Sequence, residues 1–156
     1  MRSRTPKVVA FGGGHGLAAT LTALRDVTPT ITAVVTVADN GGSSGKIRDE
    51  FNFLPPGDLR MALAALCGAD AWGQSWAQII QHRFNSQGEL NGHALGNLLL
   101  AALWDSSDDL VAGIDRVGEL LKIVGRVLPM SLEPLDIEGI FEVGSIESVV
   151  RGQIEV

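Results

Sequence analysis

The fold of this chain is decided by the stretch VVAFGGGHG (residues 8–16), in which an apolar run leads into a glycine-rich turn. Leu17, Leu21 and Leu24 follow at a spacing that lines one face of a helix. Glycines let the backbone approach a ligand closely, and the free N–H groups at the start of a helix attract anions such as phosphate. The stretch therefore predicts a strand, a tight turn and a helix that form part of a nucleotide-binding site.

A second glycine-rich turn, DNGGSSG (residues 39–45), follows the β-branched run ITAVVTV (residues 31–37). The run predicts a second strand, and its distance from the first suits one parallel strand–helix–strand unit of about 30 residues. The two turns are then expected to lie at one edge of the sheet and to form a phosphate cradle. Nucleotide binding is therefore the leading functional hypothesis.

The length and composition are typical of one domain or of a large piece of one. The chain has 156 residues, of which 46% are hydrophobic, and this is enough to bury a core. The net charge of −6 argues against sequence-independent binding of nucleic acid, which needs a basic surface, so the expected nucleotide is a small molecule. No apolar run reaches the roughly 18 residues that cross a bilayer, and we expect a cytoplasmic protein without membrane insertion.

The rest of the chain is predicted to be mainly helical. Asp58 precedes an apolar helix and is expected to cap it by accepting its first N–H groups. The sequence SSDD (residues 106–109) resembles a capping box ahead of another helix. Apolar spacing predicts a helix through Trp76, Ile79, Ile80 and Phe84, one through Leu95, Leu98, Leu99, Ala102 and Leu103, one through Leu110, Ile114, Val117, Leu121 and Val124, and a final strand at 148–156.

Neither of the two best-known phosphate-binding fingerprints fits the glycine turns. The dinucleotide pattern G-x-G-x-x-G fails because its third glycine position falls on Leu17, and the P-loop pattern fails because Ile47 occupies its hydroxyl position. What remains are the backbone N–H groups, the positive charges of Lys46 and Arg48 for phosphate, and the Asp39 carboxylate for a ribose hydroxyl, a base edge or a hydrated metal. The alternative for Lys46 and Arg48 is that they are solvated surface charges.

Four ordered motifs point to a known family. They are VVAFGGGHGL (residues 8–17), VTVADNGGSSG (residues 35–45), LPPGDLR (residues 54–60) and HALGN (residues 93–97). Together they resemble the gluconeogenesis factor family, the YvcK-like branch of the CofD-like superfamily. The resemblance runs from about residue 7 to the end of the chain. Members of that family are longer, so the resemblance implies that this is an N-terminal portion of a longer chain.

The resemblance implies a Rossmann-like α/β fold: a three-layer sandwich with a mainly parallel sheet, incomplete at its C-terminal end, spanning residues 1–156 as one domain. It also implies a protein that binds UDP-activated sugars, notably UDP-N-acetylglucosamine, and supports cell shape, cell-wall synthesis and growth on gluconeogenic carbon sources. It assigns no catalytic residue, metal ligand or required cofactor. By motif, the expected ligand-binding residues are Gly12, Gly13, Gly14, His15, Gly16, Asp39, Asn40, Gly41, Gly42, Ser43, Ser44, Lys46, Arg48, Gly57, Asp58, Arg60, His93, Gly96 and Asn97.

Two departures from the family pattern bear on function. His15 stands where many relatives have Thr, and Asn40 stands where they have a second Asp, which weakens the case for a bound metal. His93 and Asn97 are four residues apart and are expected on one helix face, directed at the ligand.

Two functions remain open. The favoured one is a regulatory protein that binds a nucleotide sugar without transforming it. The alternative is a magnesium-dependent transferase resembling 2-phospho-L-lactate transferase, with Asp39 and Asp58 available for catalysis. The helical tryptophans Trp72, Trp76 and Trp104 are expected either in the core or at the face of a homodimer.

Overall fold

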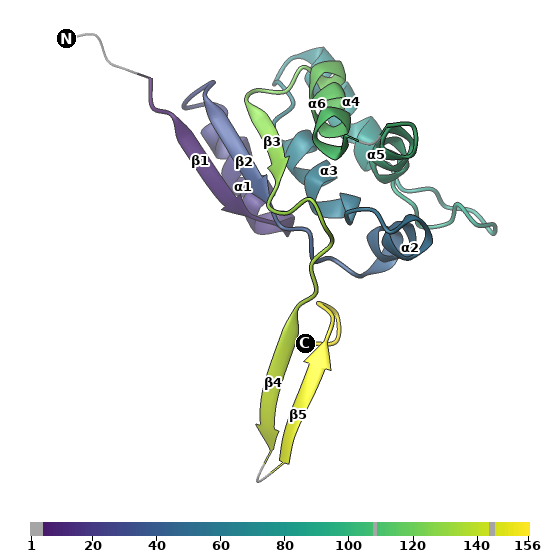
Figure 1. Ribbon diagram of the computed structural model, residues 1–156. Helices are drawn as coiled ribbons and strands as arrows, with labels where there is room; N and C mark the ends of the chain where they lie inside the picture. Colours follow the sequence, from purple (N-terminus) through teal and green to yellow (C-terminus); the bar gives the residue numbers. More distant parts are fainter. Residues whose placement is uncertain (1–4, 108, 144–145) are drawn as a thin grey trace.

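The computed structural model describes residues 5–107, 109–143 and 146–156, and it has the α/β architecture expected from the sequence (Figure 1). The elements in chain order are β1 (Val8–Gly12), α1 (Gly14–Leu24), β2 (Ile31–Val35), α2 (Gly42–Phe51), α3 (Pro56–Ala65), α4 (Ala71–Gln81), α5 (Leu95–Asp105), α6 (Leu110–Leu121), β3 (Arg126–Pro129), β4 (Glu138–Val143) and β5 (Ile146–Arg151).

The central sheet has three parallel strands in the order β1-β2-β3. Val8 pairs with Ile31, and Thr32 pairs with Arg126, so β2 lies between the other two strands. The strand–helix–strand unit predicted from the first two apolar runs is confirmed as β1-α1-β2, with β2 ending at Val35 rather than two residues later. As a result, the carboxyl ends of β1 and β2 lie side by side.

One face of the sheet is buried under helices. Ala33 and Val35 of β2 are fully buried and belong to the same apolar cluster as Leu21 of α1 and Leu63 of α3. The regular alternation of buried and half-buried residues along β2 is that of a strand packed firmly on one side. The core therefore lies between this face and the helices, with α3 packed against α1, α4 and α5.

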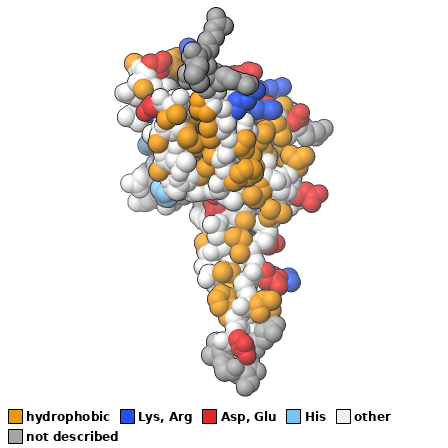
Figure 2. All heavy atoms as spheres, turned by 90° about the vertical axis from the view of Figure 1, so that its left-hand side faces the viewer, with side chains coloured by type: hydrophobic (Ala, Val, Ile, Leu, Met, Phe, Trp, Pro, Cys, Tyr) orange, Lys and Arg blue, Asp and Glu red, His pale blue; other side chains and the backbone are white. Residues whose placement is uncertain are grey.

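The opposite face of the sheet is open along β1. Val9 is 56% exposed and Phe11 is 71% exposed. Figure 2 views the molecule from this side and shows hydrophobic side chains gathered on the surface of the body. Parallel sheets are usually covered on both faces, and the second helical layer of a three-layer sandwich is not formed by residues 5–107, 109–143 and 146–156.

Several helix ends differ from the sequence prediction. Asp58 does not cap α3, because the helix begins at Pro56 and its N-cap is Pro55. Proline suits the first helical position, where its missing N–H is not needed, so α3 starts earlier than Asp58 suggests. Phe84 lies beyond the end of α4, and α6 ends at Leu121. Asp109 does cap α6, by accepting from the Ala112 N–H, while Asp108 of the predicted capping box lies outside the described residues.

The end of the chain forms a separate hairpin instead of a further strand of the central sheet. β4 and β5 pair antiparallel, and the chain turns at Gly152 after β5. The hairpin extends away from the helices and the sheet (Figure 1). Among the described helices, none has the length and apolar character needed to span a membrane.

The two faces of the sheet provide a test of this architecture. We expect Val35→Ala to lower the free energy of unfolding by about 1.5–3 kcal/mol, because it opens a cavity in the core. Val9→Ala makes the same chemical change on the open face and should cost less than about 0.5 kcal/mol. Urea denaturation followed by tryptophan fluorescence measures both. Equal losses would contradict the assignment of β1's outer face as uncovered.

Candidate functional site

Three helices begin around one cavity at the carboxyl edge of the sheet. Gly14 of α1, Gly42 of α2 and Gly57 of α3, each in the first turn of its helix, line a cavity of about 340 Å³. The N-terminal end of a helix carries partial positive charge and unpaired N–H groups. The structure thus brings the two glycine turns together, and we call this cavity the cradle.

Hydrogen bonds beyond the strand ends hold the first turn beside α3. The Thr36 N–H donates to the Gly12 carbonyl at 2.9 Å, and Thr36 Oγ1 donates to Asp58 Oδ2 at 2.9 Å. A side chain at Gly13 would collide with both Thr36 Oγ1 and the Asp58 carboxylate. Gly13 therefore permits the close approach of the first turn to α3 without itself lining the cradle.

The second turn is fixed by its own side chains. Asp39 Oδ1 accepts from the Gly41 N–H at 2.9 Å, and Ser44 Oγ accepts from the Gly57 N–H at 3.0 Å. The second bond joins the start of α2 to the start of α3. Asp39 also lines the cradle, where its carboxylate can accept from a hydroxyl of a ligand.

A buried polar network lies behind the cradle and connects α3, α5 and the second turn. Arg60 Nε donates to Asn97 Oδ1 at 2.9 Å, and Asn97 Nδ2 donates to Ser43 Oγ at 3.0 Å. Ser43 Oγ also lies 3.1 Å from His93 Nδ1. Arg60 is 5% exposed and Asn97 is 1% exposed. Asn97 therefore fixes the positions of two side chains that do line the cradle, Ser43 and Arg60.

Arg60 is the principal cation of this site. Burial lowers the pKa of Arg60 from its usual value, the nearby Arg83 lowers it further, and Asp58 and Asp39 oppose the shift. Within the described residues Arg60 has no ion pair, and its two Nη groups have no hydrogen-bond partner. Because an arginine stays protonated in proteins, it presents a buried positive charge to the cavity.

The predicted ligand-binding residues divide into two groups. Those that line the cradle are Gly14, His15, Asp39, Gly41, Gly42, Ser43, Ser44, Gly57, Asp58 and Arg60. Those that do not are Gly12, Gly13, Gly16, Asn40, Lys46, Arg48, His93, Gly96 and Asn97.

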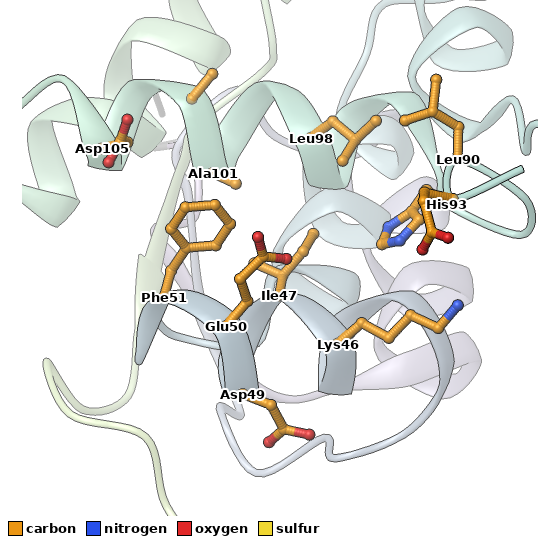
Figure 3. A pocket seen from close by; sticks show the side chains of 12 residues that line it. Lys46, Ile47, Asp49, Glu50, Phe51, Leu90, His93, Leu98, Ala101 and Asp105 are labelled. Atoms are coloured by element: carbon orange, nitrogen blue, oxygen red, sulfur yellow. The ribbon is translucent and has the colours of Figure 1, made fainter.

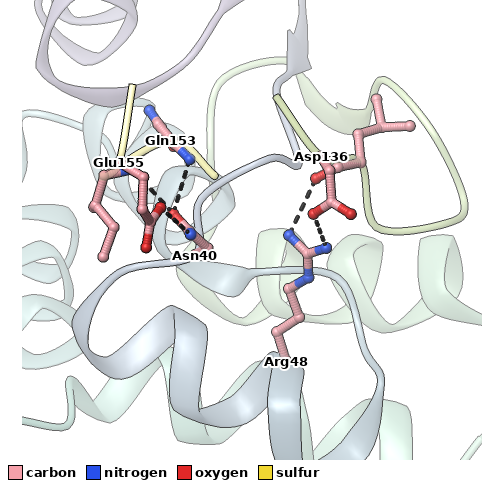
Figure 4. A network of polar contacts seen from close by, with 7 residues as sticks. Asn40, Arg48, Asp136, Gln153 and Glu155 are labelled. Atoms are coloured by element: carbon pink, nitrogen blue, oxygen red, sulfur yellow. Dashed lines mark hydrogen bonds and ion pairs between the residues drawn. The ribbon is translucent and has the colours of Figure 1, made fainter. Parts of the chain in front are cut away.

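Lys46 and Arg48 are directed elsewhere because only the first turn of α2 faces the cradle. Lys46 lines a different cavity, of about 740 Å³, between α2 and α5, together with Phe51 and Asp105 (Figure 3). Arg48 pairs with the Asp136 carboxylate (Figure 4). Neither cation can therefore supply charge to a phosphate in the cradle in this conformation.

Asn40 holds the C-terminal turn. Its Oδ1 accepts from the N–H groups of Gln153 and Ile154 at 3.0 and 3.2 Å, and its Nδ2 donates to Glu155 Oε2 at 2.9 Å (Figure 4). These bonds place Gln153 at the rim of the cradle. The amide of Asn40 is suited to this role because it both donates and accepts, which a carboxylate does not do.

Three further residues that the sequence did not predict also line the cradle: Met61, Arg83 and Gln153. Arg83 follows α4 and carries no motif of its own. It reaches the site because it forms an isolated antiparallel bridge with Ala94, inside the motif that ends with Asn97. Only the pairing of these two segments could have identified it, and no local pattern signals that pairing.

The fold and the site define an α/β protein whose candidate ligand site lies at the carboxyl edge of a parallel sheet, the usual position in open α/β folds. The family model for 2-phospho-L-lactate transferase CofD matches residues 8–156. The chain therefore belongs to the CofD family.

Individual relatives of the chain are described as gluconeogenesis factors and not as transferases. A putative gluconeogenesis factor from Mycobacterium leprae is 51% identical over 157 residues, covering 97% of this chain and 43% of that protein. The gluconeogenesis factor of Bacillus subtilis is 41% identical over 143 residues, covering 92% of this chain and 44% of that protein. These matches confirm the resemblance inferred from the four motifs.

A solved structure supports the same family fold. The crystal structure of protein BH3568 from Bacillus halodurans matches with a TM-score of 0.86 and 41% identity, over 96% of this chain and 46% of that chain. The chain thus spans less than half the length of the relatives that it matches.

The buried network yields a stability prediction. Asn97→Ala should lower the free energy of unfolding by about 2–4 kcal/mol, because Arg60 Nε and Ser43 Oγ lose a partner while they remain buried. Asn85→Ala, at an exposed loop position, is the matched control and should change it by less than about 0.5 kcal/mol. Urea denaturation measures both variants, and a loss for Asn97→Ala no larger than the control's would show that the network is not stabilising.

Proposed function

We propose that this chain binds a nucleotide sugar, UDP-N-acetylglucosamine or a close relative, and acts as a regulatory protein without transforming it. The observation that carries the proposal is the cradle, where three helix N-termini face one cavity together with the guanidinium end of Arg60, whose Nη groups have no hydrogen-bond partner in the described part of the chain. Such an arrangement favours the two phosphates of a diphosphate. No cofactor is required for binding of this kind.

The size and polarity of the cradle indicate which part of the ligand it would hold. A cavity of about 340 Å³ is at the lower end for small-molecule sites, so a whole nucleotide sugar would extend beyond it. The diphosphate is the group that best matches the helix N-termini. Asp39 at the cavity wall would accept from a ribose hydroxyl, as acidic residues do in other α/β nucleotide sites.

The biological role is proposed from the relatives. Several of them are described as gluconeogenesis factors. We infer that this chain supports growth on gluconeogenic carbon sources, cell shape and cell-wall synthesis by reporting the level of a nucleotide sugar. Its partner in this proposal is the small molecule, with no nucleic acid involved.

A magnesium-dependent transferase is the second candidate, and the CofD family match favours it. Asp39 and Asp58 both line the cradle, and Mg²⁺ commonly takes one or two carboxylates together with phosphate oxygens of the substrate. Within the described part of the chain, no three side chains of His, Cys, Asp or Glu are grouped to hold a metal by themselves. In this candidate the nucleotide would therefore bring part of the metal's coordination.

Calorimetric titration with and without magnesium separates the two candidates. The proposal expects magnesium-independent binding of UDP-N-acetylglucosamine in preference to GDP and NAD. Binding of GDP that requires magnesium would favour the transferase. Failure of every nucleotide to bind would contradict both candidates.

Substitution at Gly42 tests the placement of the diphosphate. Gly42 begins α2 with φ 49°, nothing lies within 4 Å of a Cβ built there, and Asn and Asp both tolerate this backbone conformation. We expect Gly42→Asp to weaken binding of UDP-N-acetylglucosamine roughly tenfold more than Gly42→Asn, because only the former adds a negative charge beside the phosphates. Titration of both variants measures the difference, and equal affinities would place the diphosphate elsewhere.

A further inference from the structure

A second cavity adjoins the cradle, and its charged side chains are all arginines. Its volume is about 770 Å³, and it lies beside α1, α3 and the end of α4. The residues that line both this cavity and the cradle are His15, Arg60, Met61 and Arg83, so the two spaces share a wall. Arg25 completes the cationic lining, and we call this cavity the arginine compartment.

The charge of the arginine compartment contrasts with the rest of the molecule. The chain has 12 Lys and Arg residues against 18 Asp and Glu residues. The described lining of the compartment nevertheless contains Arg25, Arg60 and Arg83 and no carboxylate. The cradle beside it contains Asp39 and Asp58. An anionic group that lies beyond the helix N-termini would therefore find more favourable surroundings in the compartment than beside Asp39 and Asp58.

The arginines retain donors for a ligand. Arg60 is only 5% exposed, and its Nη groups have no hydrogen-bond partner within the described residues. Within the described residues, Arg83 donates only from Nη1, to the Gly92 carbonyl at 2.7 Å, and forms no ion pair. Arg25 donates to the carbonyls of Ala65 and Cys67, and its buried Nε has no hydrogen-bond partner in the described chain but lies 4.0 Å from Asp26 Oδ1.

Local packing holds Arg60 between the two cavities. Its Nε is fixed by Asn97, and its aliphatic carbons lie against the backbone of Gly96 in α5. The guanidinium group is thus positioned before any ligand arrives, which reduces the entropy lost on binding. Burial lowers the pKa of Arg60 most and the neighbouring Arg83 lowers it further, while Asp58 and Asp39 oppose the shift.

We propose that the arginine compartment binds a third anionic group of the ligand, beyond the diphosphate, and that among the close relatives of UDP-N-acetylglucosamine it thereby favours those whose sugar carries a carboxylate. The proposal rests on the proposed function, because the diphosphate occupies the adjoining cradle. The planar fork of arginine matches a carboxylate with two parallel hydrogen bonds, and a charged pair of this kind is strongest away from water. A terminal phosphate offers the same charge, so the experiment includes both sources.

Two matched ligand pairs test the proposal by calorimetric titration of the whole chain. UDP-glucuronate carries a carboxylate where UDP-glucose carries a hydroxymethyl group, and UTP carries a third phosphate that UDP lacks. We expect UDP-glucuronate to bind roughly tenfold more tightly than UDP-glucose. A gain for UTP over UDP of the same size would show that the compartment takes any third anion. A gain confined to UDP-glucuronate would assign it to the sugar carboxylate.

Two variants test whether a preference for UDP-glucuronate depends on the arginine compartment. Arg83→Gln should bring the affinity ratio of UDP-glucuronate to UDP-glucose towards one, whereas Arg116→Gln, at an exposed position on α6, should leave that ratio unchanged. The ratio is an internal control, since a general loss of folding affects both ligands alike. Equal binding of the two sugars by the unaltered chain, without a gain for UTP, would overturn the compartment's role and leave the proposed function standing. Failure of both sugars to bind while UDP-N-acetylglucosamine binds would overturn the compartment's role, and failure of all three to bind would overturn the proposed function itself.

Discussion

The parallel pairing of β1 with β2 is the constraint on which the rest of the site depends. Because both strands run in the same direction, the turns that follow them leave the sheet at one edge, and the Thr36 N–H bond to the Gly12 carbonyl extends the ladder past β2. Thr36 then donates to Asp58, which fixes the start of α3 beside the first turn. The meeting of three helix N-termini follows from this geometry. Antiparallel strands would have sent the two turns to opposite ends of the sheet.

Local sequence patterns predicted the elements well and the directions of side chains poorly. The apolar run before Gly12 and the leucines after it predicted β1 and α1, because strand and helix periods differ clearly. The same patterns could not show that Lys46 faces the cavity beside α5, or that Arg48 pairs with Asp136. Those directions depend on where α2 begins and on segments distant in sequence. Arg83 was missed for the same reason, since its bridge to Ala94 is a tertiary contact.

The prediction for the motif at 93–97 was wrong about the helix but correctly grouped two residues that lie close together in space. His93 and Asn97 were expected on one helix face, but α5 begins at Leu95, so His93 precedes the helix. Both side chains nevertheless lie within hydrogen-bonding distance of Ser43 Oγ. Their role in this structure is to support Ser43 and Arg60 from behind. A network of this kind specifies a unique arrangement because each buried polar group that loses its partner destabilises the fold.

The unequal distribution of charge between the two adjoining cavities has a consequence for the orientation of a ligand. The cradle contains both signs, since Asp39 and Asp58 lie close enough to Arg60 to raise its pKa. The arginine compartment contains only positive charge. A ligand whose diphosphate lies at the helix N-termini is therefore most stable when its hydroxyl end lies near Asp39 and the anionic group at its other end lies between Arg60 and Arg83. The reverse orientation would place that terminal anionic group beside Asp39 and Asp58, where Coulomb repulsion disfavours it. Charge distribution alone thus gives the site a direction, even though the backbone N–H groups that line the cradle are chemically alike.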